Sequence, residues 1–221
     1  MSELRAVANK MVEKGKGILA ADESTPTCTK RFESINTEST TENRNFYRNM
    51  LFTSEDIEKY ISGIILFDET FHQSELSSGK KFPEYLSSKN ILPGIKVDQG
   101  LEDFSPYEKL TKGLDGLSER LEKYYSLGAK FAKWRAVITP GDSIPTDDCI
   151  LANAKSLAKY AKKCQQANLV PIVEPEVLMD GDHTIDESFN ITSRTLNMVF
   201  DQLDEHNVSL QGIVLKPNMI L

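Results

Sequence analysis

Short, nearly continuous apolar runs alternate with amphipathic stretches along this chain. Six of these runs have the length and the β-branched content expected of buried strands: residues 17–22, 61–68, 91–98, 131–138, 169–176 and the terminal run 211–220. Strands of this type are typical of parallel sheets that helices cover on both faces. The pattern therefore predicts repeated β–α units and an α/β fold.

Four stretches between the runs carry apolar residues at helical spacing: 41–51, 114–127, 147–167 and 185–203. Gly128 follows the second stretch and suits a helix C-cap, and Thr40 precedes the first as a candidate N-cap. No Gly/Ser-rich, Pro-rich or charged block separates two compositions. We therefore expect residues 1–221 to form a single domain.

Charged side chains collect toward the carboxyl ends of the predicted strands. They are Asp22, Lys96, Asp98, Lys133, Arg135, Glu174, Glu176 and Lys216. Each alone could be a solvated strand end or a helix cap. Because residues two apart face the same side of a strand, the pairs 133/135 and 174/176 each point one way. Their recurrence at equivalent depth predicts one shared cleft, at the end of the strands where (β/α)8 barrels build active sites.

Lys216 closes the last apolar run, and Pro217 then stops the strand. In a buried parallel strand, desolvation is expected to lower the pKa of an unpaired lysine and to release a neutral, nucleophilic amine. A fall of about three units from about 10.4 costs roughly 4 kcal/mol. A neighbouring Lys133 and a low-dielectric strand end could supply that shift. Such a lysine is suited to Schiff-base chemistry.

Composition narrows the choice of function. A net charge of −7 argues against nucleic-acid binding, although a local cluster of Lys and Arg could still bind an anionic substrate. The three cysteines, Cys28, Cys149 and Cys164, do not suggest a disulfide framework and favour a reduced, cytoplasmic setting. The sequence predicts no secretory signal and no membrane span. Its three histidines lie at no metal-ligand spacing, so no metal site is expected.

Several segments together resemble class I fructose-1,6-bisphosphate aldolase, the metal-independent, Schiff-base family, in the family's order and over essentially the whole chain. They are residues 16–25, 41–44, 46–48, 94–98, 113–117, 131–135, 171–176, 180–183 and 215–219. The resemblance implies a (β/α)8 TIM barrel, of which this chain covers about six of eight β–α units. We therefore expect a C-terminally incomplete barrel, from a fragment, a truncated product or a chain that needs its missing part from elsewhere.

The resemblance also implies residue roles. Catalytic roles fall to Lys216 as the Schiff-base nucleophile, Glu174 as the general acid/base, Glu176 as its neighbour, Lys133 as a second active-site lysine, and Asp22 as the carboxylate that orients a hydroxyl of the substrate. Substrate and phosphate contacts fall to Lys96, Arg135, Ser24 and Arg31. No metal and no cofactor are implied, because the iminium itself withdraws electrons during carbon–carbon cleavage.

The implied activity is reversible cleavage of fructose 1,6-bisphosphate to dihydroxyacetone phosphate and glyceraldehyde 3-phosphate, in glycolysis and gluconeogenesis. The implied partners are small sugar phosphates, identical subunits in a homotetramer and cytoskeletal proteins. Two alternatives stay open. One is another Schiff-base barrel lyase of the transaldolase kind, and the other is an inactive or partial fold that acts as a protein-binding module.

Overall fold

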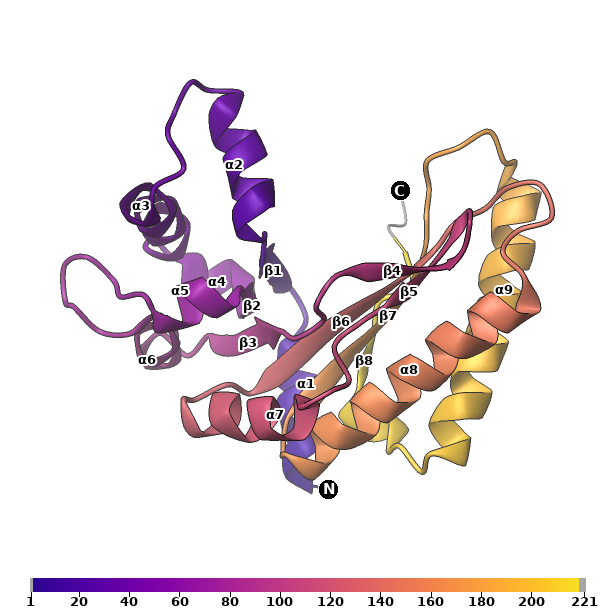
Figure 1. The fold of residues 1–221 in the computed structure, drawn as a ribbon. Helices are drawn as coiled ribbons and strands as arrows, with labels where there is room; N and C mark the ends of the chain where they lie inside the picture. The colour runs from indigo at the N-terminus through magenta and orange to yellow at the C-terminus, as the bar shows by residue number, and fades with distance from the viewer. Residues whose placement is uncertain (1, 219–221) are drawn as a thin grey trace. The chain divides into compact units, whose positions relative to one another are not determined.

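The computed structural model describes residues 2–218 (Figure 1). They divide into two compact units. The N-terminal unit comprises residues 9–96 and 124–131, and the C-terminal unit comprises residues 2–8, 97–123 and 132–218. Three elements contribute residues to both units: α1 (Ser2–Met11), α7 (Leu117–Ser126) and β6 (Phe131–Ile138).

The N-terminal unit contains three parallel strands in the order β1-β2-β3. Its elements are β1 (Gly17–Ala21), α2 (Thr25–Glu33), α3 (Thr41–Phe52), α4 (Ile57–Tyr60), β2 (Ile61–Leu66), α5 (Asp68–His72), α6 (Phe82–Ser88) and β3 (Leu92–Lys96). Ala21 pairs with Leu66, and Leu66 pairs with Ile95. Asp22 and Lys96 each directly follow a residue of this paired row. Both therefore lie at the same level, at the carboxyl edge of the sheet.

Two glycines let the ring of Phe131 approach this sheet. A Cβ on Gly94 would lie 2.1 Å from the Phe131 ring, and a Cβ on Gly63 would lie 3.0 Å from it. The ring is fully buried and fills the space that side chains on β2 and β3 would otherwise occupy. These two strands thus use glycine for close packing.

The C-terminal unit contains three further strands in the order β6-β7-β8 and a separate antiparallel hairpin. Its elements are β4 (Leu101–Ser105), β5 (Glu108–Thr111), α8 (Asp147–Gln166), β7 (Val170–Val177), α9 (Ile185–Glu205), the 3₁₀ helix η1 (Leu210–Gly212) and β8 (Val214–Leu215), together with β6. Strands β7 and β8 are parallel, with Ile172 opposite Val214 and Val173 opposite Leu215.

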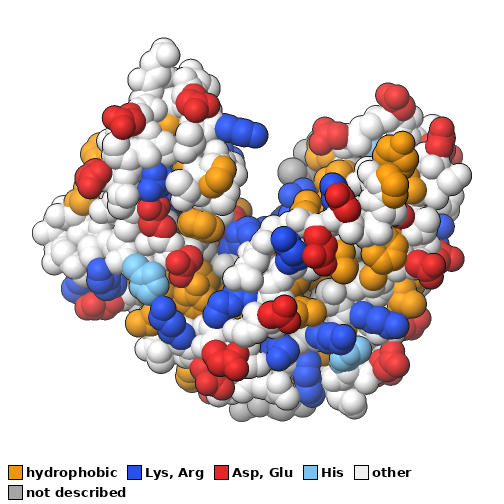
Figure 2. Space-filling view, viewed as in Figure 1, with side chains coloured by type: hydrophobic (Ala, Val, Ile, Leu, Met, Phe, Trp, Pro, Cys, Tyr) orange, Lys and Arg blue, Asp and Glu red, His pale blue; other side chains and the backbone are white. Residues whose placement is uncertain are grey.

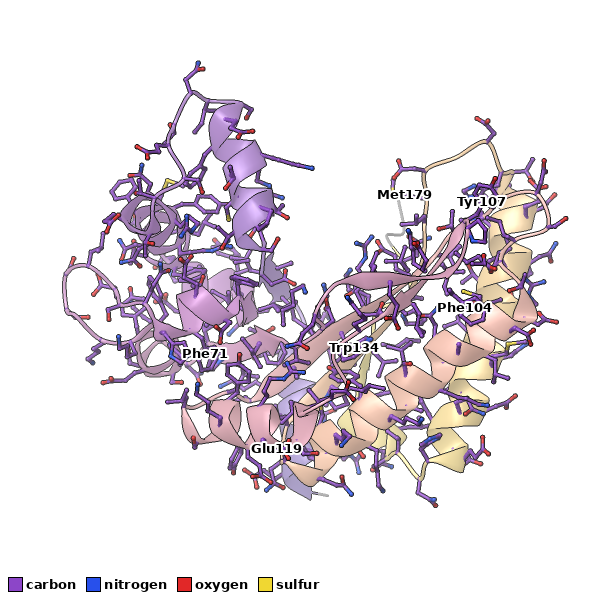
Figure 3. The ribbon with its side chains drawn as sticks, in the orientation of Figure 1. Phe71, Phe104, Tyr107, Glu119, Trp134 and Met179 are labelled. Carbon is purple, nitrogen blue, oxygen red and sulfur yellow. The ribbon has the colours of Figure 1, made fainter. Side chains whose placement is uncertain are left out.

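Helices α8 and α9 lie side by side and both pack against β7 (Figure 1). Side-chain caps begin each of them: Thr146 Oγ1 accepts the N–H of Cys149 at 3.2 Å, and Thr184 forms a reciprocal capping box with Glu187. Trp134 of β6, labelled in Figure 3, stacks on Tyr160 of α8 with their ring centroids 5.4 Å apart. This packing covers one side of β6, so the alternate residues Lys133 and Arg135 face the other side.

The α/β prediction is confirmed, and β6 spans the predicted residues 131–138. The predicted long terminal strand is wrong. Among the described residues of this run, only Val214 and Leu215 pair as a strand, because Leu210–Gly212 form a 3₁₀ turn first. Met219 and Ile220 lie outside the described residues. The β4–β5 hairpin was not predicted, because most of its residues are polar and β4 is largely exposed.

Candidate active site

Glu174 lies at the centre of a charged cluster in the C-terminal unit. Its carboxylate forms an ion pair with Lys216 through Oε1, and its Oε2 lies 3.2 Å from Nζ of Lys133. The side chain of Glu174 is 2% exposed and that of Lys133 is 10% exposed. A buried carboxylate is costly unless cations pair with it, and here two ammonium groups share one carboxylate.

Strand register explains why Glu174 and Lys216 meet. Val173 and Leu215 are strand partners, and each residue of the ion pair follows one of them directly. The N–H of Lys216 extends the ladder by one bond, to the carbonyl of Val173 at 2.9 Å. Backbone pairing alone therefore places the Cα atoms of Glu174 and Lys216 near each other, independently of any side-chain contact.

A second ion pair joins Arg135 of β6 to Glu176 of β7. Both residues stand two positions beyond members of the first cluster, Lys133 and Glu174, so the two ion pairs share one face of these strands. The backbone N–H of Arg135 also donates to Oδ2 of Asp98 at 3.5 Å. Five of the predicted site residues, Lys133, Arg135, Glu174, Glu176 and Lys216, are thus brought together.

The prediction that the side chain of Lys216 is buried is wrong. Its side chain is 42% exposed, because β8 is only two residues long and, among the described strands, pairs with β7 alone. The environment of the amine is therefore set by the contact with the Glu174 carboxylate rather than by full desolvation.

The other four predicted residues belong to the N-terminal unit. Asp22 and Lys96 lie at one level of the sheet, as the register requires. Ser24 is the residue before α2, and its hydroxyl lies 3.1 Å from that of Thr27. Arg31, on the same helix, forms an ion pair with Glu23 and lies 3.4 Å from the hydroxyl of Tyr47. All four lie at or beyond the carboxyl ends of their strands.

The N-terminal unit also contains two buried arginines that were not predicted from the sequence. Arg44 and Arg48 are buried on α3 and share a stripe with Phe52. Arg44 makes two hydrogen bonds to the Glu69 carboxylate, at 2.6 and 2.7 Å, and Arg48 pairs with Glu23. The spacing 44, 48, 52 was the available signal, since arginines four apart in line with a core phenylalanine require buried acidic partners.

Within residues 2–218, no three His, Cys, Asp or Glu side chains gather in an arrangement suited to a metal ion. In the same part of the chain, no helix combines the length and the apolar character that crossing a membrane requires.

Comparisons with known proteins show the family to which the chain belongs. The family model for glycolytic enzymes described as "Fructose-bisphosphate aldolase class-I" matches residues 3–221. A probable fructose-bisphosphate aldolase class 1 of Xanthomonas campestris pv. campestris is 51% identical over 223 residues, which cover 100% of this chain and 66% of that protein. Fructose-bisphosphate aldolase 1 of Toxoplasma gondii is 52% identical, with 99% of this chain and 61% of that protein covered.

A solved structure of fructose-bisphosphate aldolase from Plasmodium falciparum, in complex with TRAP and a small-molecule inhibitor, is also similar. It superposes with a TM-score of 0.95 at 50% identity and covers 99% of this chain and 64% of that one. This chain therefore belongs to the class I fructose-bisphosphate aldolase family and spans just under two thirds of the length of the relatives it matches. The predicted barrel of the class I aldolase type, covered in part, is confirmed.

Proposed function

We propose that this chain carries out the class I aldolase reaction, the reversible cleavage of fructose 1,6-bisphosphate to dihydroxyacetone phosphate and glyceraldehyde 3-phosphate. The observation that carries the proposal is the carboxylate of Glu174, which lies between the ammonium groups of Lys133 and Lys216. Family membership supports it independently.

In this proposal Lys216 is the nucleophile. Its ammonium must lose a proton before the nitrogen can attack the ketose carbonyl, and Glu174 is in direct contact to accept that proton. The addition gives a carbinolamine. Glu174 then returns a proton to its hydroxyl, water leaves, and an iminium forms. When the bond between C3 and C4 of the sugar breaks, Glu174 accepts the proton of the C4 hydroxyl, C4 leaves as the aldehyde, and the iminium takes up the electron pair as an enamine. A proton then adds to C3 of the enamine, and water hydrolyses the iminium to release dihydroxyacetone phosphate and regenerate Lys216.

The remaining residues bind and orient the substrate. Lys133 keeps Glu174 in place and presents a second positive charge beside the reacting carbon. Arg135 is held by Glu176 and offers its other donors to an anionic group. In the N-terminal unit, we assign Asp22 to a substrate hydroxyl, and Lys96, Ser24 and Arg31 to hydroxyl and phosphate oxygens.

We further propose that the protein self-associates. Figure 2 shows hydrophobic side chains at the surface over the β4–β5 hairpin, where Figure 3 labels Phe104 and Tyr107. Tyr107 is 75% exposed and Leu101, on the same hairpin, is also exposed. A second copy could cover this apolar surface. We expect Tyr107→Asp to lower the molar mass measured by light scattering, whereas Lys159→Met, a change at an exposed position of α8, should leave it unchanged.

A coupled assay tests the catalytic proposal. Fructose 1,6-bisphosphate is supplied, and triose phosphate release is followed by reduction with NADH. We expect turnover by the unaltered chain, none by Lys216→Met and normal turnover by Lys159→Met. If the unaltered chain gives no triose phosphate while its circular dichroism remains that of a folded α/β protein, the proposal fails.

A further inference from the structure

Arg48 is an arginine with almost no access to solvent. Its side chain is 2% exposed, on the face of α3 that also carries Arg44 and Phe52. A buried guanidinium is tolerated only where its donors find acceptors. The acceptors of Arg48 therefore indicate which segment of the chain this residue stabilises.

The guanidinium binds one residue, Glu23, in two ways. Nη1 forms an ion pair with Oε2 of the carboxylate, and Nη2 donates to the backbone carbonyl of Glu23 at 3.0 Å. The same Nη2 lies 3.6 Å from Sγ of Cys28, on the first turn of α2. Arg48 thus fixes the main chain at Glu23 as well as its side chain.

Glu23 has a particular place in the chain. It follows Asp22 and precedes Ser24, and both neighbours are assigned to the substrate in the proposed function. A displacement of the Glu23 backbone therefore moves both of those side chains. Misplacement of catalytic groups by about 1 Å can cost about a hundredfold in rate.

The second carboxylate oxygen of Glu23 points to another residue of the predicted site. Oε1 forms an ion pair with Arg31 and lies 3.3 Å from the hydroxyl of Tyr47. Arg31 is 56% exposed, in contrast to Arg48. Burial alone would raise the pKa of Glu23, but the hydrogen bond and charge of Arg48, with the charge of Arg31, hold it below its usual value. Glu23 is therefore an anion at neutral pH, and it connects the buried arginine to the exposed one.

We propose that Arg48 is a positioning residue of the active site. Through the side chain and backbone of Glu23 it fixes the Asp22–Ser24 segment, and through the shared carboxylate it orients Arg31. This inference rests on the proposed function for its effect on catalysis, while its geometric part concerns the N-terminal unit alone.

The same helix supplies a matched control. Arg44 lies one turn before Arg48, is also buried, and pairs with Glu69 and with the carbonyl of Ser39 at 2.5 Å. Among the described residues, the side-chain hydrogen bonds and ion pair of Arg44 go to Ser39, Thr41 and Glu69, and none goes to the Asp22–Ser24 segment. Lysine in place of either arginine keeps the charge but loses the planar fork that serves two acceptors at once. Arg48→Lys and Arg44→Lys should therefore lower the free energy of unfolding by similar amounts. They should differ only in the segment that loses its contacts, which is Asp22–Ser24 for Arg48→Lys alone.

The experiment compares these two variants with the unaltered 221-residue chain by two measurements. Hydrogen–deuterium exchange, read by mass spectrometry, reports the backbone amides of a peptide that covers residues 20–28. The coupled assay gives kcat and KM for fructose 1,6-bisphosphate. We expect Arg48→Lys to speed exchange in this peptide and to lower kcat/KM about tenfold or more, whereas Arg44→Lys leaves both at the unaltered level.

The proposal is overturned if Arg48→Lys leaves exchange in this peptide unchanged, or if it speeds exchange without affecting kcat/KM. It is also overturned if Arg44→Lys lowers kcat/KM equally, because general stability would then explain the loss. If the unaltered chain itself does not cleave the substrate, the proposed function fails, and the exchange data alone decide whether Arg48 fixes the segment.

Discussion

Glu174 and Lys216 meet because each follows one member of the strand pair Val173 and Leu215. Hydrogen bonding between parallel strands therefore brings the acid and the amine together, and a third group, Lys133, joins them from β6. The arrangement gives the amine a proton acceptor in direct contact. It also makes the contribution of each group separable by substitution.

Removal of the negative charge of Glu174, which Lys133 and Lys216 share, should lower the rate of the reaction more than the stability of the fold. In Glu174→Gln, the amide keeps the size of the side chain but cannot take a proton from Lys216. We expect kcat for fructose 1,6-bisphosphate to fall by about 10²–10⁴-fold, the usual contribution of a general acid/base. Glu119→Gln, a matched change on the exposed face of α7 (Figure 3), should leave kcat unchanged. Equal kcat values for Glu174→Gln and the unaltered chain would contradict the acid/base role.

Glu108 joins the hairpin to the start of α8. Its buried carboxylate accepts the N–H of Thr146 at 2.7 Å and the hydroxyls of Thr146 and Ser105, each at 3.0 Å. In Glu108→Gln, an amide NH₂ replaces one acceptor, so a buried donor loses its partner. We expect the free energy of unfolding in urea to fall by about 1–3 kcal/mol. The control Glu102→Gln, an exposed position on β4, should change it by less than about 0.5 kcal/mol.

Close packing on Phe131 makes Gly94 intolerant of a side chain. Because an added Cβ would lie 2.1 Å from the ring, Gly94→Ala must displace either Phe131 or the strand. We expect a loss of about 1–3 kcal/mol in urea unfolding. Gly17 is also a strand glycine, but nothing lies within 4 Å of its added Cβ, so Gly17→Ala should be neutral or slightly stabilising. Similar losses in both variants would show that strand glycine itself, rather than Phe131, sets the cost.

The loop after α5 should respond to acid. The hydroxyl of Ser78 and the N–H groups of Ser77 and Ser78 donate to Glu75 and lower its pKa to about 2. The stabilisation is fully present above the ordinary carboxyl pKa of about 4.3 and is lost as the pH falls toward 2. We expect the amide chemical shifts of Ser77 and Ser78 to titrate with a midpoint near 2, and Glu75→Gln to abolish that titration. A midpoint near 4 would contradict these contacts.

The parallel strands were predictable because burial on both faces leaves a clear signal in sequence. Phe131–Ile138 is nearly all apolar and matches its prediction. The hairpin gave no such signal, since Leu101–Ser105 is mostly exposed and polar. The terminal run was overestimated because its apolar composition does not distinguish a 3₁₀ turn at Leu210–Gly212 from a strand.

The site was predictable as a set of residue types but not as a set of contacts. Sequence spacing put Lys133 with Arg135 and Glu174 with Glu176, since alternate strand residues share a face. It did not predict that Glu174 would pair with two lysines, because that depends on the register of β7 with β8 and on side-chain rotamers. The partnership of Arg48 with Glu23 likewise joins residues 25 positions apart through tertiary packing.

The position of the covalent bond tests the central claim most directly. The chain is incubated with dihydroxyacetone phosphate, reduced with borohydride, digested and mapped by mass spectrometry. A stable adduct is expected on the peptide that contains Lys216, absent from Lys216→Met and retained in Lys159→Met. An adduct on a different lysine, or one that persists in Lys216→Met, would contradict the account.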